Sequence, residues 1–253
     1  MILATGPTGA GKTTTIYSVL KLLNDRGVNI MTIEDPVEYD IEGVNQIQVN
    51  PKTNLTFAEG LKSIVRQDPD IILVGEIRDF ETADIAINSA MTGHIVLSTL
   101  HTNDAATAIP RLLDMKIEPF LLASTVNVII AQRLVRKIHG RCRVSVDTQV
   151  ETLTKYVDNA LLQKTFGDNS KIRLYKGKGC QLDHGIGYEG RVGIFEVLII
   201  DEEIRQAIID RRDAVTIKKI AAKNGMTTMI HDGLEKVKEG ITTIDEVLRV
   251  TKE

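Results

Sequence analysis

The feature that most constrains this chain is the glycine-rich stretch Gly6-Pro7-Thr8-Gly9-Ala10-Gly11-Lys12-Thr13, which matches the pattern G-x-x-x-x-G-K-[ST] in full. The apolar residues 2–4 precede it and predict a short strand, and residues 14–23 carry apolar side chains at helical spacing. A strand, a glycine loop and a helix in this order form the setting in which such a loop binds nucleotide phosphates. The alternative is a glycine-rich turn that matches by chance.

This loop predicts a specific chemistry for nucleotide binding. Glycines allow a tight turn whose N–H groups point inward, and the following helix adds partial positive charge at its N-terminus. Lys12 is predicted to contact the β- and γ-phosphates, and Thr13 to offer its hydroxyl to Mg²⁺. The candidate nucleotide-binding residues of the loop are therefore Gly6, Pro7, Thr8, Gly9, Ala10, Gly11, Lys12, Thr13 and Thr14.

Acidic side chains follow two predicted strands. Residues 28–33 predict a buried strand that ends in Glu34, Asp35 and Glu38. Ligands bind at the carboxyl ends of strands in α/β sheets, so we expect these acids near the nucleotide. The alternative is a solvated turn.

Residues 71–74 are four large aliphatic residues, and Gly75 and Glu76 follow them. This pattern is typical of a second strand at a nucleotide site, although the conventional version has aspartate directly after the aliphatic residues. Glu76 is predicted to position water, act as a base or hold the metal through water. The alternative is that Glu76 only pairs with Arg78 or a lysine. Arg78 itself is also a candidate catalytic residue.

Two histidines flank the strand predicted at residues 94–100. His101 follows the strand, so it would lie at the same edge as Glu76 if the sheet is parallel, where a polar group could sense a γ-phosphate. His94 stands at the beginning of the strand, and its spacing leaves a structural and a functional role equally open.

The order of elements predicts an α/β fold with a central, mostly parallel sheet. Helices are expected at residues 56–66, 80–91, 104–115 and 119–131, between strands. Near residue 139 the composition changes. A helix is expected at 147–166, a glycine-rich loop at 175–188, a strand at 191–200, and helices at 202–211, 216–224, 232–239 and from 243 onward. We therefore expect a nucleotide-binding core at 1–138 and a smaller, mostly helical C-terminal subdomain at 139–253.

Composition excludes several classes of protein. The net charge of −3 over 253 residues gives no electrostatic argument for a nucleic-acid partner. No apolar run approaches the length of a membrane span, and no secretory signal is recognisable. Two cysteines do not make a disulfide framework. We expect a cytoplasmic protein with no nucleic-acid partner and no membrane insertion.

Four blocks in order resemble the secretion ATPases of type II secretion and type IV pilus systems. Residues 6–15 carry the phosphate loop, 32–39 resemble the family's Asp box, 66–79 its atypical Walker B block with glutamate, and 92–103 its His box. The sequences Gln132-Arg133-Leu134-Val135 and Gly187-Tyr188-Glu189-Gly190-Arg191 also fit. The resemblance extends through nearly the whole chain, and residues 232–243 look more like the assembly branch than the pilus-retraction branch.

The resemblance implies a RecA-like fold and a homo-hexameric ring with Mg²⁺-ATP at the subunit interfaces. Hydrolysis would drive subunit motion, and an inner-membrane platform protein at the inner face of the plasma membrane would receive it and extend a pilus or pseudopilus. By analogy with the family, Glu76 polarises the attacking water. Glu34, Asp35 and Glu38 act near the metal, and His94 and His101 support the γ-phosphate end.

Two departures from the family pattern follow. Family members carry a region ahead of the phosphate loop that supplies arginines to the nucleotide, and this sequence starts five residues before Gly6. We therefore expect the N-terminal domains to lie outside it. Assembly-type members often hold zinc with two C-x-x-C pairs, and the matching places here read His139-x-x-Cys142 and Cys180-x-x-Asp183, within the region 139–190. All four residue types can bind zinc. The alternative is a degenerate loop that folds without metal.

Three functions are compatible with these features. The first is a motor ATPase of pilus assembly or secretion. The second is a nucleotide-binding assembly module with little turnover of its own, since the upstream arginines are absent. The third is a DNA-translocating motor on the same core, which the mild acidity disfavours. A GTPase is disfavoured because no N-K-x-D stretch occurs. Type II secretion, type IV pili and competence pili share these motifs.

Overall fold

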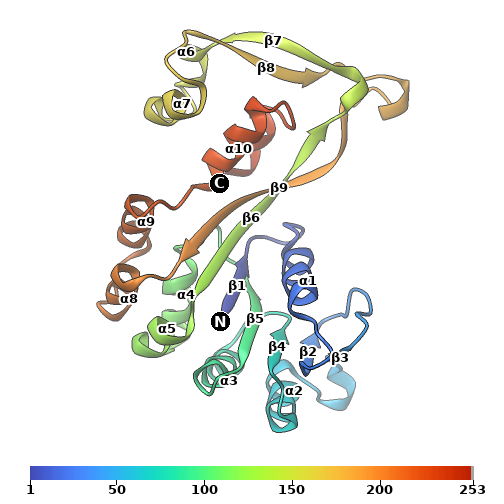
Figure 1. The fold of residues 1–253 in the computed structure, drawn as a ribbon, viewed down its shortest axis with the longest axis vertical. Helices are drawn as coiled ribbons and strands as arrows, with labels where there is room; N and C mark the ends of the chain where they lie inside the picture. The colour runs from blue at the N-terminus through green and yellow to red at the C-terminus, as the bar shows by residue number, and fades with distance from the viewer. Residues whose placement is uncertain (252–253) are drawn as a thin grey trace. The chain divides into compact units, whose positions relative to one another are not determined.

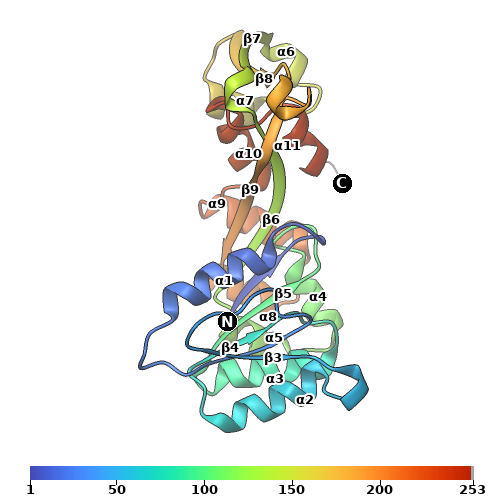
Figure 2. The ribbon, with the colours of Figure 1, turned by 90° about the vertical axis from the view of Figure 1, so that its right-hand side faces the viewer.

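The computed structural model describes residues 1–251, which form two compact units (Figures 1 and 2). Unit 1 comprises Met1–Ala131 and Val197–Met226, and unit 2 comprises Gln132–Glu196 and the described chain from Thr227 onward. Unit 1 is discontinuous in sequence because two helices near the C-terminus belong to it. The first segment of unit 1 ends at Ala131, a few residues before the domain boundary expected between residues 138 and 139. That boundary stays a prediction.

A seven-stranded sheet has the order β3-β2-β4-β5-β1-β6-β9. Its neighbouring strands from β3 through β6 are all parallel. The sheet consists of β1 (Ile2–Thr5), β2 (Ile30–Glu34), β3 (Val44–Gln48), β4 (Ile71–Val74), β5 (Ile95–Leu100), β6 (Val128–Ile138) and β9 (Tyr188–Ile199). β4 coincides with the predicted aliphatic strand, because a strand covered on both faces requires a continuous apolar run.

Alternating residues of the central strands bury opposite faces of the sheet. Ile71 and Leu73 of β4 share an apolar cluster with Ile16 and Leu20 of α1 (Lys12–Leu23), so α1 covers one face. On the other face, Gly60 of α2 (Phe57–Ile64) packs so closely on β2 that a Cβ there would come within 2.7 Å of Ile33 Cδ1. Figure 2 shows α1 on one side of the sheet and α2 on the other.

The remaining helices of unit 1 are α3 (Phe80–Met91), α4 (Ala108–Asp114), α5 (Pro119–Thr125), α8 (Glu202–Ile209) and α9 (Ala214–Lys223), with 3₁₀ turns η1 (Pro51–Thr53) and η2 (Val65–Gln67). The predicted caps are present. Thr56 Oγ1 accepts from the Glu59 N–H at 3.2 Å, and Asp79 Oδ1 accepts from the Thr82 N–H at 2.8 Å. Among residues 1–251, no helix has both the length and the apolar character that crossing a membrane requires.

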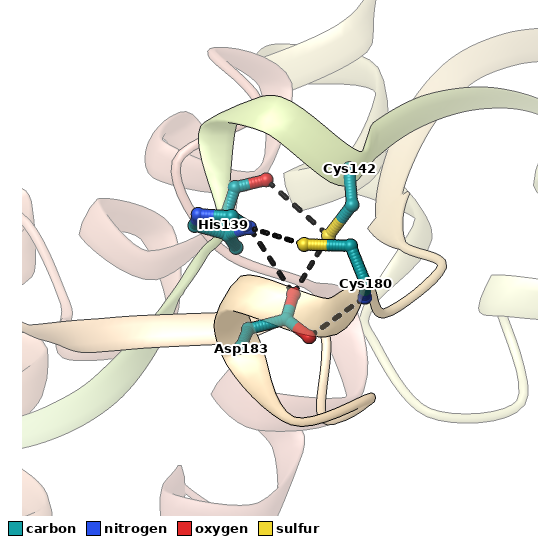
Figure 3. A group of neighbouring side chains, drawn as sticks. All are labelled: His139, Cys142, Cys180 and Asp183. Atoms are coloured by element: carbon teal, nitrogen blue, oxygen red, sulfur yellow. Dashed lines mark hydrogen bonds and ion pairs between the residues drawn. The ribbon is translucent and has the colours of Figure 1, made fainter.

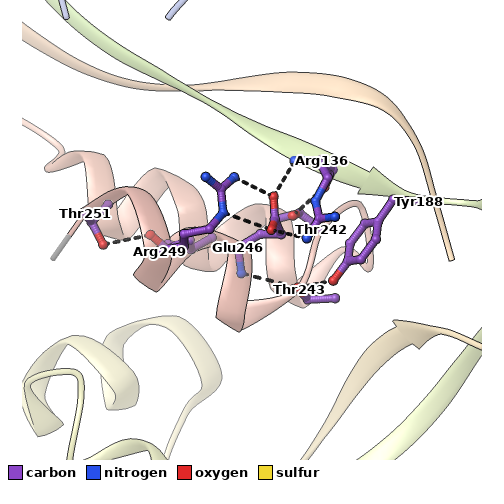
Figure 4. A network of polar contacts seen from close by, with 8 residues as sticks. Arg136, Tyr188, Thr242, Thr243, Glu246, Arg249 and Thr251 are labelled. Carbon is purple, nitrogen blue, oxygen red and sulfur yellow. Dashed lines mark hydrogen bonds and ion pairs between the residues drawn. The ribbon is translucent and has the colours of Figure 1, made fainter. Parts of the chain in front are cut away.

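Unit 2 contains an antiparallel pair of strands and four helices among its described residues. The elements are β7 (Arg143–Gln149), β8 (Lys171–Gly177), α6 (Val150–Leu153), α7 (Asn159–Phe166), α10 (Met229–Lys238) and α11 (Ile244–Thr251), with 3₁₀ turns η3 (Gly140–Cys142) and η4 (Gln181–Asp183). Within this unit, the buried Glu246 of α11 receives hydrogen bonds from Arg136 and Arg249 (Figure 4).

Two expected helices were wrong in part. The helix expected at 119–131 ends at Thr125, because Val128 to Ala131 instead pair with β1 in the middle of the sheet. Of the helix expected at 147–166, residues 147–149 instead belong to strand β7, which alternates in exposure and pairs antiparallel with β8. Two separate helices follow, α6 and α7, and Asp158 caps the second. In both places long-range strand pairing overrides local helical preference. The predicted α/β class with a mostly parallel sheet is confirmed.

Candidate functional site

The carboxyl ends of β1, β2, β4 and β5 meet at one edge of the parallel sheet. The register aligns Thr5 with Leu100 and Val74 with both Ile33 and Ser98. Four segments lie at these strand ends, namely residues 6–11, 34–38, 75–78 and His101. We call this set the loop edge. The structure thus brings the predicted phosphate loop, two acidic segments and one histidine to the same edge, as expected.

The phosphate loop has the backbone that a phosphate cradle requires. Gly9 and Gly11 adopt φ of 77° and 89°, a region that favours glycine, and α1 begins at Lys12 immediately afterwards. Lys12 is buried, and its Nζ donates to the carbonyls of Gly6 at 2.8 Å and Pro7 at 3.2 Å. The ammonium is therefore held over the loop, while Thr13 and Thr14 occupy the first turn of the helix.

Glu76 is the best-placed carboxylate for catalysis at the loop edge. Only 11% of its side chain is exposed. Its Oε1 contacts an Arg78 guanidinium nitrogen at 2.5 Å, and its Oε2 lies 3.3 Å from His101 Nε2. Within residues 1–251, Oε2 is a buried oxygen that accepts no hydrogen bond. Such an atom in a native site calls for water or an ion, so the residue fits the predicted role toward water and Mg²⁺.

Arg78 and Asp35 complete the charge distribution around Glu76. A hydrogen bond from Arg78 to Glu76 and the charge of that carboxylate raise the pKa of Arg78 above its usual value, and the charge of Asp35 adds to the effect. Asp35 is exposed, as is Glu38. The pairing of Glu76 with Arg78 is therefore present together with a buried oxygen, Oε2, that accepts no hydrogen bond within residues 1–251.

Glu34 differs from the other acids, because its carboxylate is buried and hydrogen-bonded to three side chains. Oε1 accepts from Thr32 Oγ1 at 2.7 Å and from Gln46 Nε2 at 3.2 Å, and Oε2 accepts from the Tyr17 hydroxyl. Burial and the Glu34 carboxylate raise the pKa of Tyr17, so the hydroxyl stays protonated and donates. Glu34 thereby links β2 to the helix that follows the phosphate loop.

Tyr17 is a residue of this site that the sequence patterns missed. It lies on the apolar face of α1, where periodicity marks a core residue and gives no sign of the hydroxyl's partner. The same hydroxyl also accepts from the Glu38 N–H and from Gln46 Nε2, each at 3.4 Å. Tyr17 therefore ties both ends of the acidic segment 34–38 to α1.

His94 lies at the other edge of the sheet. It precedes β5, whose six residues separate it from the end that His101 follows. Its Nδ1 is 2.8 Å from the carbonyl of Ser89 and 3.1 Å from Thr92 Oγ1, at the C-terminal end of α3. Within one copy of unit 1 the structure does not bring His94 to the phosphate loop, and its contacts fit the structural alternative.

A second cluster of functional side chains lies entirely within unit 2 (Figure 3). Among the described residues, His139, Cys142, Cys180 and Asp183 form a candidate ligand set, in which one ligand atom of each falls within 4.8 Å of the others. Cys142 Sγ lies 2.9 Å from Asp183 Oδ2, and Cys180 Sγ lies 3.5 Å from His139 Nδ1. The structure therefore assembles the four residues that the sequence singled out, and a His/Cys₂/Asp set is chemically suited to zinc.

The glycines of the 175–188 stretch shape the loop that carries half of this cluster. Gly179 has φ of 79°, and a Cβ there would come within 2.3 Å of the Gly185 carbonyl oxygen. The two backbone segments consequently approach more closely than any side chain permits. This approach closes the loop around Cys180 and Asp183.

Comparisons with known proteins agree with this geometry. The family described as Type II/IV secretion system protein matches residues 1–249. The chain is 50% identical over 253 residues to the type IV pilus assembly ATPase PilB of Thermus thermophilus, and 51% identical over the same length to the type II secretion system protein E of Xanthomonas campestris pv. campestris. All of this chain is matched in both cases, but it spans only 28% and 44% of those relatives' lengths.

A solved structure supports the fold. The pilus retraction motor PilT with bound ADP superimposes with a TM-score of 0.72 at 31% identity, over 100% of this chain and 61% of that chain. The expected resemblance to secretion ATPases, drawn from motifs, is thereby confirmed over the whole length. The chain belongs to the Type II/IV secretion system protein family.

Proposed function

We propose that this chain is the ATP-hydrolysing part of a type IV pilus assembly or type II secretion motor, in which Mg²⁺-ATP hydrolysis in a homo-hexameric ring extends a pilus or pseudopilus. One observation carries the proposal most directly. Glu76 is a buried glutamate at the same sheet edge as a complete phosphate loop, and its Oε2 accepts no hydrogen bond from the part of the chain that the structure describes. The names of relatives at about 50% identity, one a pilus assembly ATPase and one a type II secretion protein, support the machine class.

The residues divide the chemistry between them. Lys12 and the loop N–H groups would hold the phosphates, and Thr13 would offer its hydroxyl to Mg²⁺, which neutralises charge developing on the phosphates. Glu76 would orient the attacking water through the Oε2 that accepts no hydrogen bond among the described residues. His101, 3.3 Å from that oxygen, is placed to pass a proton or to contact a γ-phosphate. Asp35 and Glu38 are the exposed acids left for the metal's water shell.

The proposed partners and location rest on the family resemblance and not on contacts of this chain. We propose further copies of the same chain as ring neighbours and an inner-membrane platform protein as the recipient of motion. The protein would then work in the cytoplasm at the inner face of the plasma membrane. Neither the charge nor the site suggests a nucleic-acid partner, and tight DNA binding at moderate salt would revive the DNA-translocating alternative.

The test is the steady-state ATPase rate against protein concentration, with Glu76→Gln as the matched control. We expect a specific rate that climbs with concentration and vanishes in the variant, because the site completes itself between copies and lacks its base without Glu76. ATP binding with no turnover would favour the nucleotide-binding assembly module instead. Wild-type turnover in Glu76→Gln would move the catalytic carboxylate to Asp35, Glu38 or Glu34.

We also propose that unit 2 binds one zinc ion through His139, Cys142, Cys180 and Asp183. Zinc there would supply a structural cross-link between the 3₁₀ turns η3 and η4, which the chain separates by about 40 residues. Elemental analysis of protein purified without chelator and under reducing conditions should find about one equivalent. Less than a few tenths of an equivalent would retire the site in favour of a loop that folds without metal.

A further inference from the structure

We propose that Glu189 is the positioning residue for the metal ligand His139, holding the imidazole so that its Nδ1 faces the zinc position. This inference rests on the zinc site proposed above and extends it to a residue outside the four ligands. Glu189 lies in the stretch Gly187-Tyr188-Glu189-Gly190-Arg191, which resembles the family. No ligand atom of Glu189 belongs to the cluster of Figure 3.

The two nitrogens of His139 face different groups. Nδ1 lies 3.1 Å from Asp183 Oδ2 and 3.5 Å from Cys180 Sγ, so it belongs to the ligand cluster. Nε2 lies on the other side of the ring, 3.4 Å from a carboxylate oxygen of Glu189. The side chain of His139 is 9% exposed, so protein groups determine how the ring lies.

The backbone brings the two residues together. The N–H of His139 donates to the Gly187 carbonyl at 3.0 Å, two residues before Glu189. This bond anchors the beginning of η3 beside the beginning of β9, and it sets the Glu189 side chain next to the ring. The backbone hydrogen bond therefore places Glu189 close to His139 before the two side chains adopt their conformations.

The chemistry explains why a carboxylate belongs there. A neutral imidazole binds a metal through the nitrogen that lacks a proton, and the proton then sits on the other nitrogen. An acceptor at Nε2 favours the proton on that atom, frees Nδ1 for the metal and makes Nδ1 a stronger donor. A histidine at this place needs such an outer partner, whereas a cysteine ligand does not.

Asp183 is oriented in a comparable way. Its Oδ1 accepts from the N–H groups of Cys180 at 2.7 Å and Gly185 at 3.0 Å, which leaves Oδ2 facing His139 and Cys142. In both non-sulfur ligands, one atom contacts groups outside the cluster, namely Nε2 of His139 and Oδ1 of Asp183. The other atom, Nδ1 or Oδ2, faces the cluster. Preorganisation of this kind raises metal affinity, because the ligand side chains lose less conformational freedom when the metal binds.

The experiment measures the zinc affinity of the whole chain under reducing conditions, by competition of Zn²⁺ with a chromophoric chelator. Outer partners of metal-bound histidine contribute about 10- to 100-fold, and the side chain of Glu189 is 75% exposed, so we expect Glu189→Ala to bind zinc about tenfold more weakly. Glu189→Gln, which keeps a neutral acceptor, should fall between. Glu151→Ala, at an exposed glutamate of the same unit, is the control and should match wild type.

A second background separates positioning from simple attraction between charges. In His139→Cys no Nε2 remains, so adding Glu189→Ala should change zinc affinity by less than about twofold. Melting temperatures of the zinc-free proteins should agree among the Glu189 variants, because the residue acts on the ligand and not on the fold. An equal tenfold loss in the His139→Cys background would overturn the proposal, since the carboxylate would then act only through its charge.

The remaining outcomes are also decisive. Glu189→Ala with wild-type affinity would overturn the role of Glu189 and leave the zinc site standing. Wild-type protein that binds no zinc would overturn both metal proposals and leave the ATPase proposal untouched, because the loop edge lies in unit 1 and is tested by turnover.

Discussion

Replacing Glu246 with glutamine should remove a large share of the stability of unit 2. The carboxylate is buried and accepts hydrogen bonds from Arg136 and Arg249 (Figure 4). Arg136 donates from its backbone N–H at 2.9 Å and its guanidinium at 2.7 Å, and Arg249 donates from two nitrogens at 3.1 and 2.8 Å. Arg136 in turn stacks 4.2 Å from the Tyr188 ring centre, so the carboxylate joins β6, β9 and α11.

The magnitude follows from the pKa of Glu246. Burial alone would raise it, but the hydrogen bonds from Arg249 and Arg136 outweigh burial and lower the pKa from 4.5 to about 2. That difference corresponds to ~3 kcal/mol of stability in the ionised state. The two guanidinium groups are about half exposed, and water partly replaces the lost partner, so we expect Glu246→Gln to cost about 2–3 kcal/mol at pH 7.

The pH dependence gives the sign of the effect. Because the folded pKa is depressed, the contribution is complete above the unfolded pKa near 4.5 and is lost as the pH falls from there toward 2. Urea unfolding of wild type and Glu246→Gln should therefore differ by a constant amount from pH 7 to about 5. The difference should shrink by roughly 1.4 kcal/mol for each pH unit below about 4.5.

Asp245→Asn is the matched control for this measurement. Asp245 is the exposed neighbour in the first turn of α11, and its neutralisation should cost less than about 1 kcal/mol. A difference below 1 kcal/mol for Glu246→Gln at pH 7, or one that stays constant between pH 5 and 3, would refute the reasoning. It would mean that the ion pairs only offset the desolvation of the carboxylate.

Other predictions follow from the loop edge. Lys12→Ala should weaken ATP binding on the order of a hundredfold or more in a fluorescent-nucleotide assay, because the positive charge that would contact the phosphates is lost. Unchanged affinity would contradict the assignment of the phosphate loop. Tyr17→Phe should lower the free energy of unfolding by ~1–3 kcal/mol in a urea titration, because the buried Glu34 loses a hydrogen-bond donor. Tyr39→Phe is the control and should have little effect, because its exposed ring only packs edge-on against Tyr17. His94→Ala should leave ATP affinity within about threefold of wild type, because His94 lies beyond the far end of β5; a tenfold loss would show that a neighbouring copy supplies this histidine to the nucleotide.

The sequence by itself determined most of the elements of unit 1 and brought Glu76, His101 and the phosphate loop to one edge of its sheet. The phosphate loop, the strand of four aliphatic residues and the capped helix α3 are local patterns, and the structure reproduces their bounds closely. Once a sheet is parallel, every residue that follows a strand lies at one edge, so Glu76 and His101 could be placed together from the sequence alone. The same rule places His94, which precedes β5, at the opposite edge of the sheet, and the role that the family resemblance implies for it stays a prediction.

Only the tertiary structure decided what each acid does and how the middle of the chain folds. Glu34 and Glu76 are both glutamates at the carboxyl ends of buried strands. Yet Glu34 is satisfied by Tyr17, Thr32 and Gln46 from three elements, whereas Glu76 keeps an oxygen without a hydrogen bond among the described residues. Residues 128–131 of β6 and 147–149 of β7 replaced parts of expected helices, because their pairing partners lie far away in the chain and local periodicity carries no information about partners. The contact between Glu189 and His139 has the same origin, because backbone pairing across some 50 residues of chain places a carboxylate where no spacing rule would look for it.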